Sequence, residues 1–244
     1  MTKEEYIKRF DKDYCVGWAA IDEHLEHHYP DDKPYIRDIY GGIENYPEDR
    51  KSYYQSINKD PKLQVFPNQQ YLYSVAHYKQ DFEGKEFTHS IAYGGSNLFY
   101  DPEEAEVPIS GFGYELTMRN YPFGKDYYLV NVLFMMLDRY CMMNQGLLYE
   151  YSCVPLSEPL HESDSDITAI ILVPDPLLKS IDTPHGKVDF LQVVGITTAE
   201  LEKLKHANHL KEAIKTLAAE IAKENPLFIT DLERSSIKNL EAIV

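Results

Sequence analysis

Apolar residues recur at helical spacing over residues 17–29, in GWAAIDEHLEHHY. Four of them lie about 3.6 residues apart and so share one helical face: Trp18, Ile21, Leu25 and Tyr29. Pro30 cannot continue a helix, so the helix should end there and YPDDKP should form a turn.

Two further helices are predicted from their first residues. Thr2 with Glu5, and Thr197 with Glu200, have the spacing of a capping box, in which each side chain binds the backbone N–H of the other residue. One helix should therefore begin at the N-terminus. Another should run from Thr197 to about residue 222, with an interruption near 208–209.

Strand patterns fill the middle of the chain. The segments 71–78 and 87–95 are rich in aromatic and β-branched residues, and DFEGKE between them has Gly84 where a hairpin turn needs a glycine. Over 110–118 the residues alternate, so one face carries four apolar side chains: Phe112, Tyr114, Leu116 and Met118. Gly113 on the other face indicates a bulge or a close backbone approach.

The second half of the chain predicts three more strands and a buried helix. We expect strands over 169–173, 188–196 and 227–233. The turn TPHG before the second of these strands should leave His185 exposed. Residues 126–143 are apolar nearly all round, which is typical of a buried helix.

This order of elements favours one α+β domain over residues 1–244, with a central sheet and flanking helices. Residues 31–68 show weak periodicity and should be irregular or form short elements. HESDSD (161–166) should be a polar loop.

The charge of the chain bears on its partners. There are 24 Lys and Arg against 40 Asp and Glu, which gives a net charge of −16 at pH 7 and a pI near 4.9. Such a surface repels nucleic acid and anionic membranes, so we expect neither as a partner. It suits a basic protein partner, because opposite fields accelerate encounter. The alternative is that the charge serves solubility alone.

Three cysteines, Cys15, Cys141 and Cys153, with no CxxC motif indicate neither a disulfide framework nor a zinc knuckle, and they fit a reducing compartment. The N-terminal residues MTKEEYIKRF have no apolar core of a signal peptide, and no apolar stretch approaches the length of a membrane span. We therefore expect a soluble, cytoplasmic protein.

Candidate catalytic and metal sites are weak. His24 and His28 share a helical face at a spacing that zinc can use, but HLEHH is not HExxH, and a solvated helix face is the simpler interpretation. The glycines at 94–95 and 111–113 match no nucleotide-binding motif. No GxSxG motif occurs, and the spacing of residues along the chain indicates no catalytic triad with Cys15 or Cys141 as its nucleophile. We expect no metal and no cofactor.

Four carboxylates lie in or beside predicted strands: Glu115, Asp175, Asp189 and Asp231. If two of them met, they could serve acid–base catalysis. Hydrogen bonding to turn backbone, together with solvation, is the simpler alternative.

Taken together, the motifs resemble the suppressor of fused family. Four segments follow the family's order: SGFGYELT (110–117), LVPDP (172–176), TPHGKVDFLQVVGIT (183–197) and LFITDLERSSI (227–237). GWAAIDEHLEHHYPDD (17–32) resembles the family's opening helix, and HSIAYGGSNLFYD (89–101) resembles its strand and turn before the SGFGFELT strand. The resemblance covers roughly residues 15–237.

The resemblance implies a central mixed, largely antiparallel β-sheet flanked by helices on both sides. In animals this domain is the N-terminal half of a two-domain protein that binds transcription factors of the Hedgehog pathway. Bacterial members are similar to immunity proteins, which neutralise a toxin by binding it. Because no second domain follows here, we expect the compact bacterial form. The family supplies no catalytic residue, so we expect a non-enzymatic protein.

The family-like segment from residue 89 to the acidic residues after it is our candidate partner-binding surface. Its candidate residues are His89, Tyr93, Tyr100, Asp101, Glu103 and Glu104. Aromatic residues can anchor a desolvated contact while neighbouring charges set its register. The alternative is that the tyrosines pack the sheet and Asp101 caps a turn. For the whole protein we expect binding of a basic toxin; a scaffold for another host partner and a hydrolase with an acidic site are the alternatives.

Overall fold

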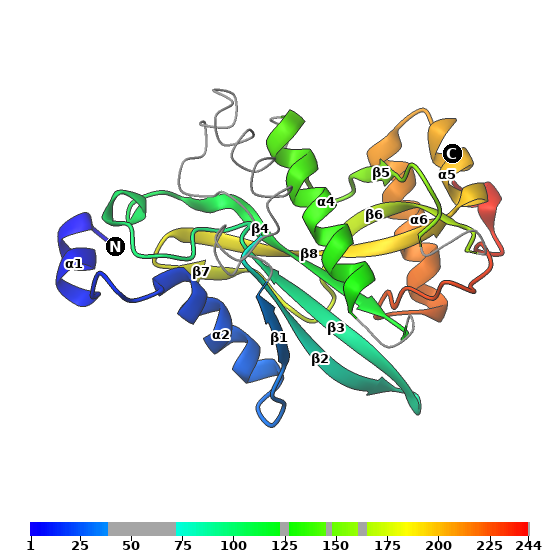
Figure 1. Ribbon diagram of the computed structural model, residues 1–244. Coiled ribbons are helices and arrows are strands. Elements are labelled where there is room, and N and C mark those ends of the chain that lie inside the picture. The colour runs from blue at the N-terminus through cyan, green and yellow to red at the C-terminus, as the bar shows by residue number, and fades with distance from the viewer. Residues whose placement is uncertain (39–71, 123–126, 145–147, 161–164, 244) are drawn as a thin grey trace, which may run out of the picture.

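A mixed β-sheet forms the centre of the protein (Figure 1). The computed structural model describes residues 1–38, 72–122, 127–144, 148–160 and 165–243. Its strands are β1 (Tyr35–Asp38), β2 (Ser74–Phe82), β3 (Lys85–Tyr93), β4 (Ile109–Asn120), β5 (Cys153–Pro155), β6 (Ile167–Pro174), β7 (Ile181–Thr183) and β8 (Gly186–Thr197). The order is β1-β2-β3-β4-β8-β6-β5, and β7 pairs with β8.

The sheet is largely antiparallel, as the resemblance predicts. Among the strands within the described ranges, β4 and β8 form the parallel pair, and the other pairs are antiparallel. The register of β4 against β8 shifts between Ile109 and Tyr114, and Gly113 there has φ of 86°. This left-handed conformation suits glycine, so the predicted irregularity at Gly113 is confirmed.

The helices begin and end close to their predicted positions. They are α1 (Lys3–Arg9), α2 (Val16–His28), α4 (Tyr128–Asn144), α5 (Thr198–Lys205) and α6 (Leu210–Glu224), with the short 3₁₀ helices η3 (Pro102–Glu104) and η4 (Leu240–Ala242). Both predicted capping boxes form, and the chain breaks between α5 and α6 as expected. None of the helices in the described residues combines the length and apolar character that crossing a membrane requires.

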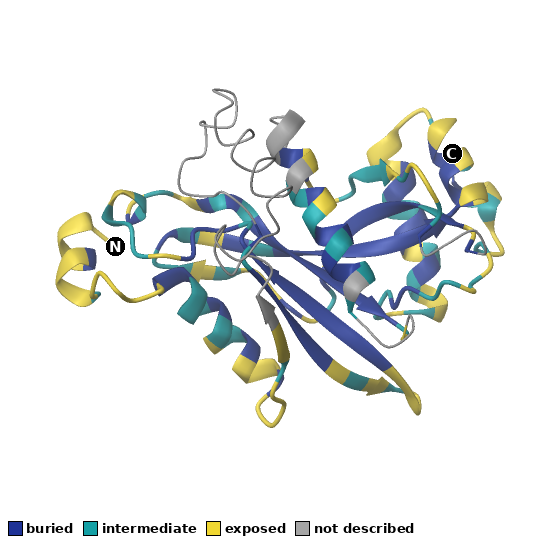
Figure 2. Ribbon diagram, in the orientation of Figure 1, coloured by how far each residue is buried: buried dark blue, intermediate teal, exposed yellow. Residues whose placement is uncertain are grey.

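Helices cover both faces of the sheet (Figure 2). Helix α4 packs on the face that carries the predicted apolar row of β4, from Phe112 to Met118. The opposite face is covered in two parts: α2 packs on β2 and β3, and α5 with α6 packs on β6 and on the end of β8. The predicted α+β architecture with helices on both sides is therefore confirmed.

The β2–β3 hairpin turns at two residues, as Gly84 predicts. Glu83 and Gly84 have φ of 55° and 80°, the conformation of a tight hairpin turn, and the strands extend to Phe82 and Lys85 on either side. Strand β8 is the predicted buried strand, and Phe190 to Val194 are all buried.

Three predictions need correction. Residues 227–233 form no strand and contribute one isolated bridge, between Thr230 and Asn120. The side-chain amide of Asn225 hydrogen-bonds both the N–H and the C=O of Ile229. These local hydrogen bonds take the place of those that Ile229 would form with a neighbouring strand. Helix α4 is not buried all round, because Met136 is 51% exposed and Tyr140 is 47% exposed.

The third correction concerns His185. This side chain is fully buried, not exposed, because two partners from distant segments enclose it. Of residues 31–68, β1 is a short strand, and residues 39–68 lie outside the described residues. Most of the predicted loop 161–166 also lies outside them.

Candidate interaction surface

The segment between β3 and β4 carries four of the predicted partner-binding residues at or near the surface. Asp101 caps η3 by accepting a 2.9 Å hydrogen bond from the Glu103 N–H, and Pro102 follows it at the first helical position. Tyr100, Asp101 and Glu104 are half-buried, and the side chain of Glu103 is 76% exposed. Asp101 therefore caps a turn, as the alternative interpretation had it, and η3 sets the backbone conformation of the neighbouring carboxylates.

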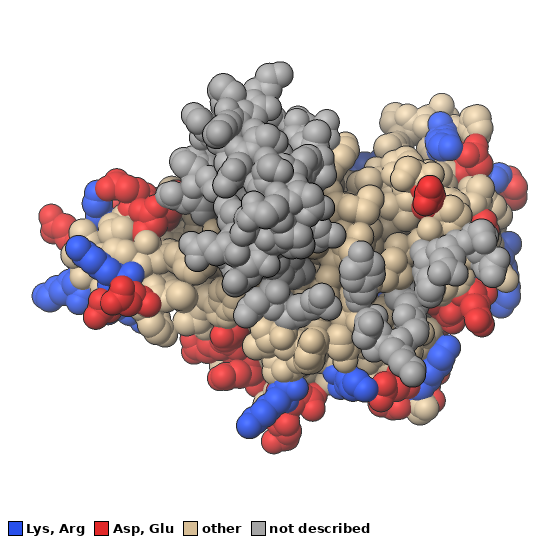
Figure 3. Space-filling model, viewed as in Figure 1, with Lys and Arg blue, Asp and Glu red and all other residues tan. Residues whose placement is uncertain are grey.

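Helix α1 packs against this acidic segment. Lys3 forms an ion pair with Glu103, and the Lys3 N–H also donates to Glu106 at 3.4 Å. Acidic and basic side chains accordingly lie next to each other at the end of the molecule that carries α1 (Figure 3). Exposed Glu106 was not among the predicted residues, although its place in the same run of carboxylates could have indicated it.

A buried hydrogen-bonded chain fixes the position of the acidic segment. Tyr6 is the buried residue of α1, and its hydroxyl lies 2.6 Å from His185 Nε2 and accepts from the Asp101 N–H at 3.2 Å. His185 Nδ1 lies 2.8 Å from the carbonyl oxygen of Asn97. A carbonyl only accepts, so Nδ1 carries the proton and Nε2 accepts from Tyr6. Burial lowers the pKa of His185, in keeping with a neutral ring.

The other two predicted partner-binding residues lie inside the protein. Tyr93 is 3% exposed; its ring stacks on Trp18, with centroids 4.6 Å apart, and its hydroxyl donates to Asp22 at 2.8 Å. His89 has no exposed surface. Both point from β3 toward α2, so neither reaches a partner directly in this structure, and Tyr93 packs the sheet as the alternative interpretation had it.

His89 belongs to a buried polar cluster that the sequence did not indicate. The cluster lies on the sheet between the apolar contacts of α2 and those of α5 and α6, and its members are Tyr29, His89, Thr117, Arg119, Asp175 and Gln192. Arg119 binds both oxygens of Asp175, at 2.9 and 3.0 Å, and also donates to Gln192. The cluster joins three strands, the end of α2 and the loop after β6.

The protonation of this cluster follows from its partners. Arg119 donates toward His89 Nδ1 at 3.4 Å, so Nδ1 is the acceptor, and Nε2 carries the hydrogen and lies 3.2 Å from Asp175. Burial, assisted by the Arg119 charge, lowers the pKa of His89 to about 4. Burial would raise the pKa of Asp175, but His89 and Arg119 hold it well below its usual value. At neutral pH the cluster therefore contains a neutral imidazole and a paired carboxylate.

We predict that His89 stays neutral in the folded protein down to pH 5. Unfolded His89 would bind its proton near pH 6.5 and the folded residue only near pH 4, so this group makes the fold less stable as pH falls through that window, by roughly 3 kcal/mol in full. Ring ¹⁵N chemical shifts should report the Nε2–H tautomer throughout. A His89 titration midpoint near 6.5 would contradict the prediction.

The four carboxylates that the sequence placed in or beside strands each have their own partners. Glu115 accepts from the backbone of Gly94, Gly95 and Ser96, which is the simpler role that the sequence suggested. Asp175 belongs to the buried cluster, Asp189 pairs with Lys187, and Asp231 pairs with Lys85. Burial raises the pKa of Glu115 to about 7, against the opposing effect of its hydrogen bonds.

No group of three or more His, Cys, Asp or Glu residues is arranged to hold a metal ion among the described residues. The ring of His24 lies against Phe190, with centroids 5.3 Å apart, and lies 4.9 Å from the ring of His28.

Comparison with known proteins connects this fold to one family. The family model for suppressor of fused protein matches residues 69–235. The suppressor of fused homologs of Homo sapiens and Mus musculus are each 32% identical to this chain over 166 residues, covering 61% of this chain and 32% of each relative. The chain thus spans about a third of the length of these relatives.

Solved structures show the same fold. A chain in the crystal structure of a Sufu–Fu complex has a TM-score of 0.73 and 22% identity, over 94% of this chain and 96% of that one. Drosophila Suppressor of Fused has a TM-score of 0.70 and 22% identity, over 94% of this chain and 53% of that one. A suppressor of fused homolog from Neisseria gonorrhoeae has a TM-score of 0.55 and 13% identity, over 91% and 96% of the two chains.

Proposed function

The chain belongs to the suppressor of fused family, and we propose that it is a non-enzymatic protein that binds and neutralises a basic protein toxin, as an immunity protein. Family membership carries the protein-binding part of this proposal, since one structural relative was solved in a complex of Sufu with Fu. The net charge of −16 supports a basic partner, because complementary fields steer association. We further propose that the chain acts as one domain in the cytoplasm.

The proposed partner surface is the acidic segment from Tyr100 to Glu106. Its carboxylates are exposed or half-buried, η3 and Tyr6 hold its backbone, and the ring of Tyr100 packs 5.2 Å from that of Tyr6. A rigid acidic segment with an aromatic neighbour suits electrostatic steering followed by a desolvated contact. This surface would orient the partner before tighter contacts form.

A regulatory scaffold for a partner other than a toxin is the second candidate. The 32% identity to animal suppressor of fused homologs favours it. The two functions differ in what the captured protein does to a cell. Affinity capture from the source organism, with identification by mass spectrometry, should yield a basic protein that stops growth when expressed alone and not when co-expressed with this chain. A partner without toxicity would favour the scaffold, and an acidic partner would contradict the charge argument.

We predict that reversing charge on η3 slows association with that partner about ten-fold or more at low salt. The variant is Glu103→Lys with Glu104→Lys, and it keeps Asp101 because that side chain caps η3. The expected effect shrinks as salt rises, since exposed charges are screened beyond about 8 Å at physiological ionic strength. Stopped-flow association rates measure it.

The matched control for that experiment reverses two carboxylates on α5 and α6, Glu202→Lys with Glu212→Lys. These residues carry the same charge but lie at the other end of the chain's fold, where each pairs with a lysine. Equal slowing by both variants would indicate a diffuse effect of net charge and would remove η3 from the proposal.

A further inference from the structure

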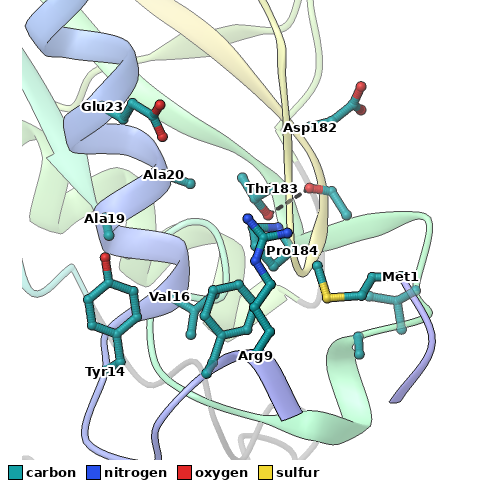
Figure 4. A pocket seen from close by; sticks show the side chains of 14 residues that line it. Met1, Arg9, Tyr14, Val16, Ala19, Ala20, Glu23, Asp182, Thr183 and Pro184 are labelled. Carbon is teal, nitrogen blue, oxygen red and sulfur yellow. Dashed lines mark hydrogen bonds between the residues drawn. The ribbon is translucent and has the colours of Figure 1, made fainter. Parts of the chain in front are cut away.

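A groove of about 510 Å³ lies between α1, α2 and the turn that joins β7 to β8 (Figure 4). One wall is formed by small side chains on α2: Val16, Ala19 and Ala20. Phe10 and Tyr14, from the loop between α1 and α2, also line the groove, and Pro184 lies on the wall that faces α2. The volume is in the range of sites that hold a small molecule or a few residues of a peptide.

The walls of this groove are held by specific contacts. The Tyr6 hydroxyl, bonded to His185, attaches α1 to the base of the β7–β8 turn. Within that turn, Thr183 donates to the Gly186 carbonyl at 2.8 Å and accepts from the His185 N–H at 3.1 Å. Gly186 has φ of 99°, and a Cβ there would lie 2.7 Å from the backbone oxygen of Val107. A preformed groove of this kind loses little conformational entropy when it binds.

The charged groups of the groove are unevenly placed. Glu23 on α2 and Asp182 on β7 stand on opposite walls at the same end, and the Arg9 guanidinium extends between the walls (Figure 4). Both carboxylates belong to exposed residues. Among the residues that the structure describes, no cation lies within ion-pair distance of Glu23 or Asp182, and Arg9 has no carboxylate partner; its contact is with the ring of Phe10 at 5.2 Å.

This arrangement is complementary to a particular kind of peptide. A lysine or arginine side chain would lie between the two carboxylates, and an adjacent apolar side chain would cover Ala19 and Ala20. The five N–H donors of Arg9 would bind backbone carbonyl oxygens of the same segment. Ala105 and Val107, which follow η3 directly, line the same groove, so it is continuous with the acidic segment.

We propose that this groove binds an extended segment of a basic protein partner, one that carries a lysine or arginine next to an apolar residue. The inference rests on the proposed function, because it takes the partner to be a basic protein. The partner would then have two points of contact. The acidic residues of η3 steer it toward this chain, and the groove between α1 and α2 binds a short sequence of the partner selectively.

The test uses the full ¹⁵N-labelled chain and two synthetic peptides, acetyl-Gly-Leu-Lys-Leu-Gly-amide and the same peptide with glutamate in place of lysine. We expect the lysine peptide to shift the amide resonances of Ala19, Ala20 and Thr183 with saturation, and the glutamate peptide to shift them little. The double variant Glu23→Gln with Asp182→Asn should lower the affinity for the lysine peptide about five-fold. Ala20→Leu, which fills the groove and suits a helix, should abolish its binding.

The control variant Glu202→Gln with Glu212→Gln removes two carboxylates from α5 and α6 and should leave the peptide affinity unchanged. Equal shifts with both peptides, or none with either, would overturn the inference. Concentration-dependent shifts without peptide would show a second copy of the chain in the groove and would also overturn it. Charge reversal on η3 could slow association with the captured partner while Ala20→Leu leaves the affinity for that partner unchanged. This result would leave the proposed function standing and remove the groove from it.

Discussion

Leu191→Asp is expected to leave the protein unfolded at room temperature. Leu191 is 3% exposed in β8, where its neighbours across the sheet are Leu116 on β4 and Pro174 on β6. It packs in the apolar cluster beneath α4, where the buried side chains that surround it are hydrophobic. An unpaired buried charge costs several kcal/mol, which is comparable to the whole stability of a typical domain.

Circular dichroism and urea titration measure this loss. Leu191→Met is the matched control, because it keeps the volume and apolar character of the side chain and should cost less than about 1.5 kcal/mol. A folded Leu191→Asp protein with a cooperative urea transition would show that β8 is not the centre of the core.

Arg119→Met is expected to destabilise the fold by about 3–5 kcal/mol, the usual cost of breaking a buried ion pair. Arg119 is fully buried and is the largest side chain among the fully buried residues that the structure describes. Methionine would fill much of its volume but would leave the Asp175 carboxylate in the interior without its bidentate partner. The penalty arises from that uncompensated charge more than from lost packing.

A second substitution separates these two causes. Asp175→Asn in the Arg119→Met background removes the charge and keeps an acceptor oxygen for the backbone N–H groups of Leu177 and Leu178. We therefore expect the double variant to recover part of the stability in urea titrations. Lys79→Met, at an exposed position on β2, should change stability by less than about 0.5 kcal/mol. An Arg119→Met protein as stable as the parent would contradict the assigned role of the cluster.

Features that depend on neighbours along the chain were predictable from the sequence. The capping boxes at Thr2 and Thr197 form because both partners lie within one helical turn. The β2–β3 turn forms at Gly84 because a two-residue hairpin needs positive φ. The alternation of residues over 110–118 predicted that the apolar side chains of β4 share one face. The motifs that resemble the suppressor of fused family predicted the architecture.

The same local patterns failed where a distant residue decides the outcome. The pattern of residues 227–233 predicts a strand, but the Asn225 side chain binds the backbone of Ile229. Of this segment, Thr230 forms the one isolated bridge to β4. His185 read as an exposed turn residue, but Tyr6, 179 positions away, closes over it. His89 and Tyr93 were expected at the surface, and α2 covers them.

What the sequence by itself determined is therefore the set of elements, the family and the acidic character of the protein. Tertiary structure alone decided which polar residues meet. Arg119, Asp175 and His89 come together from two strands and a loop, and the groove beside Ala19 joins α1, α2 and the β7–β8 turn. The physical reason is that periodicity reports which face a side chain occupies, whereas its partner across that face is set by sheet order and helix packing, which no local pattern contains.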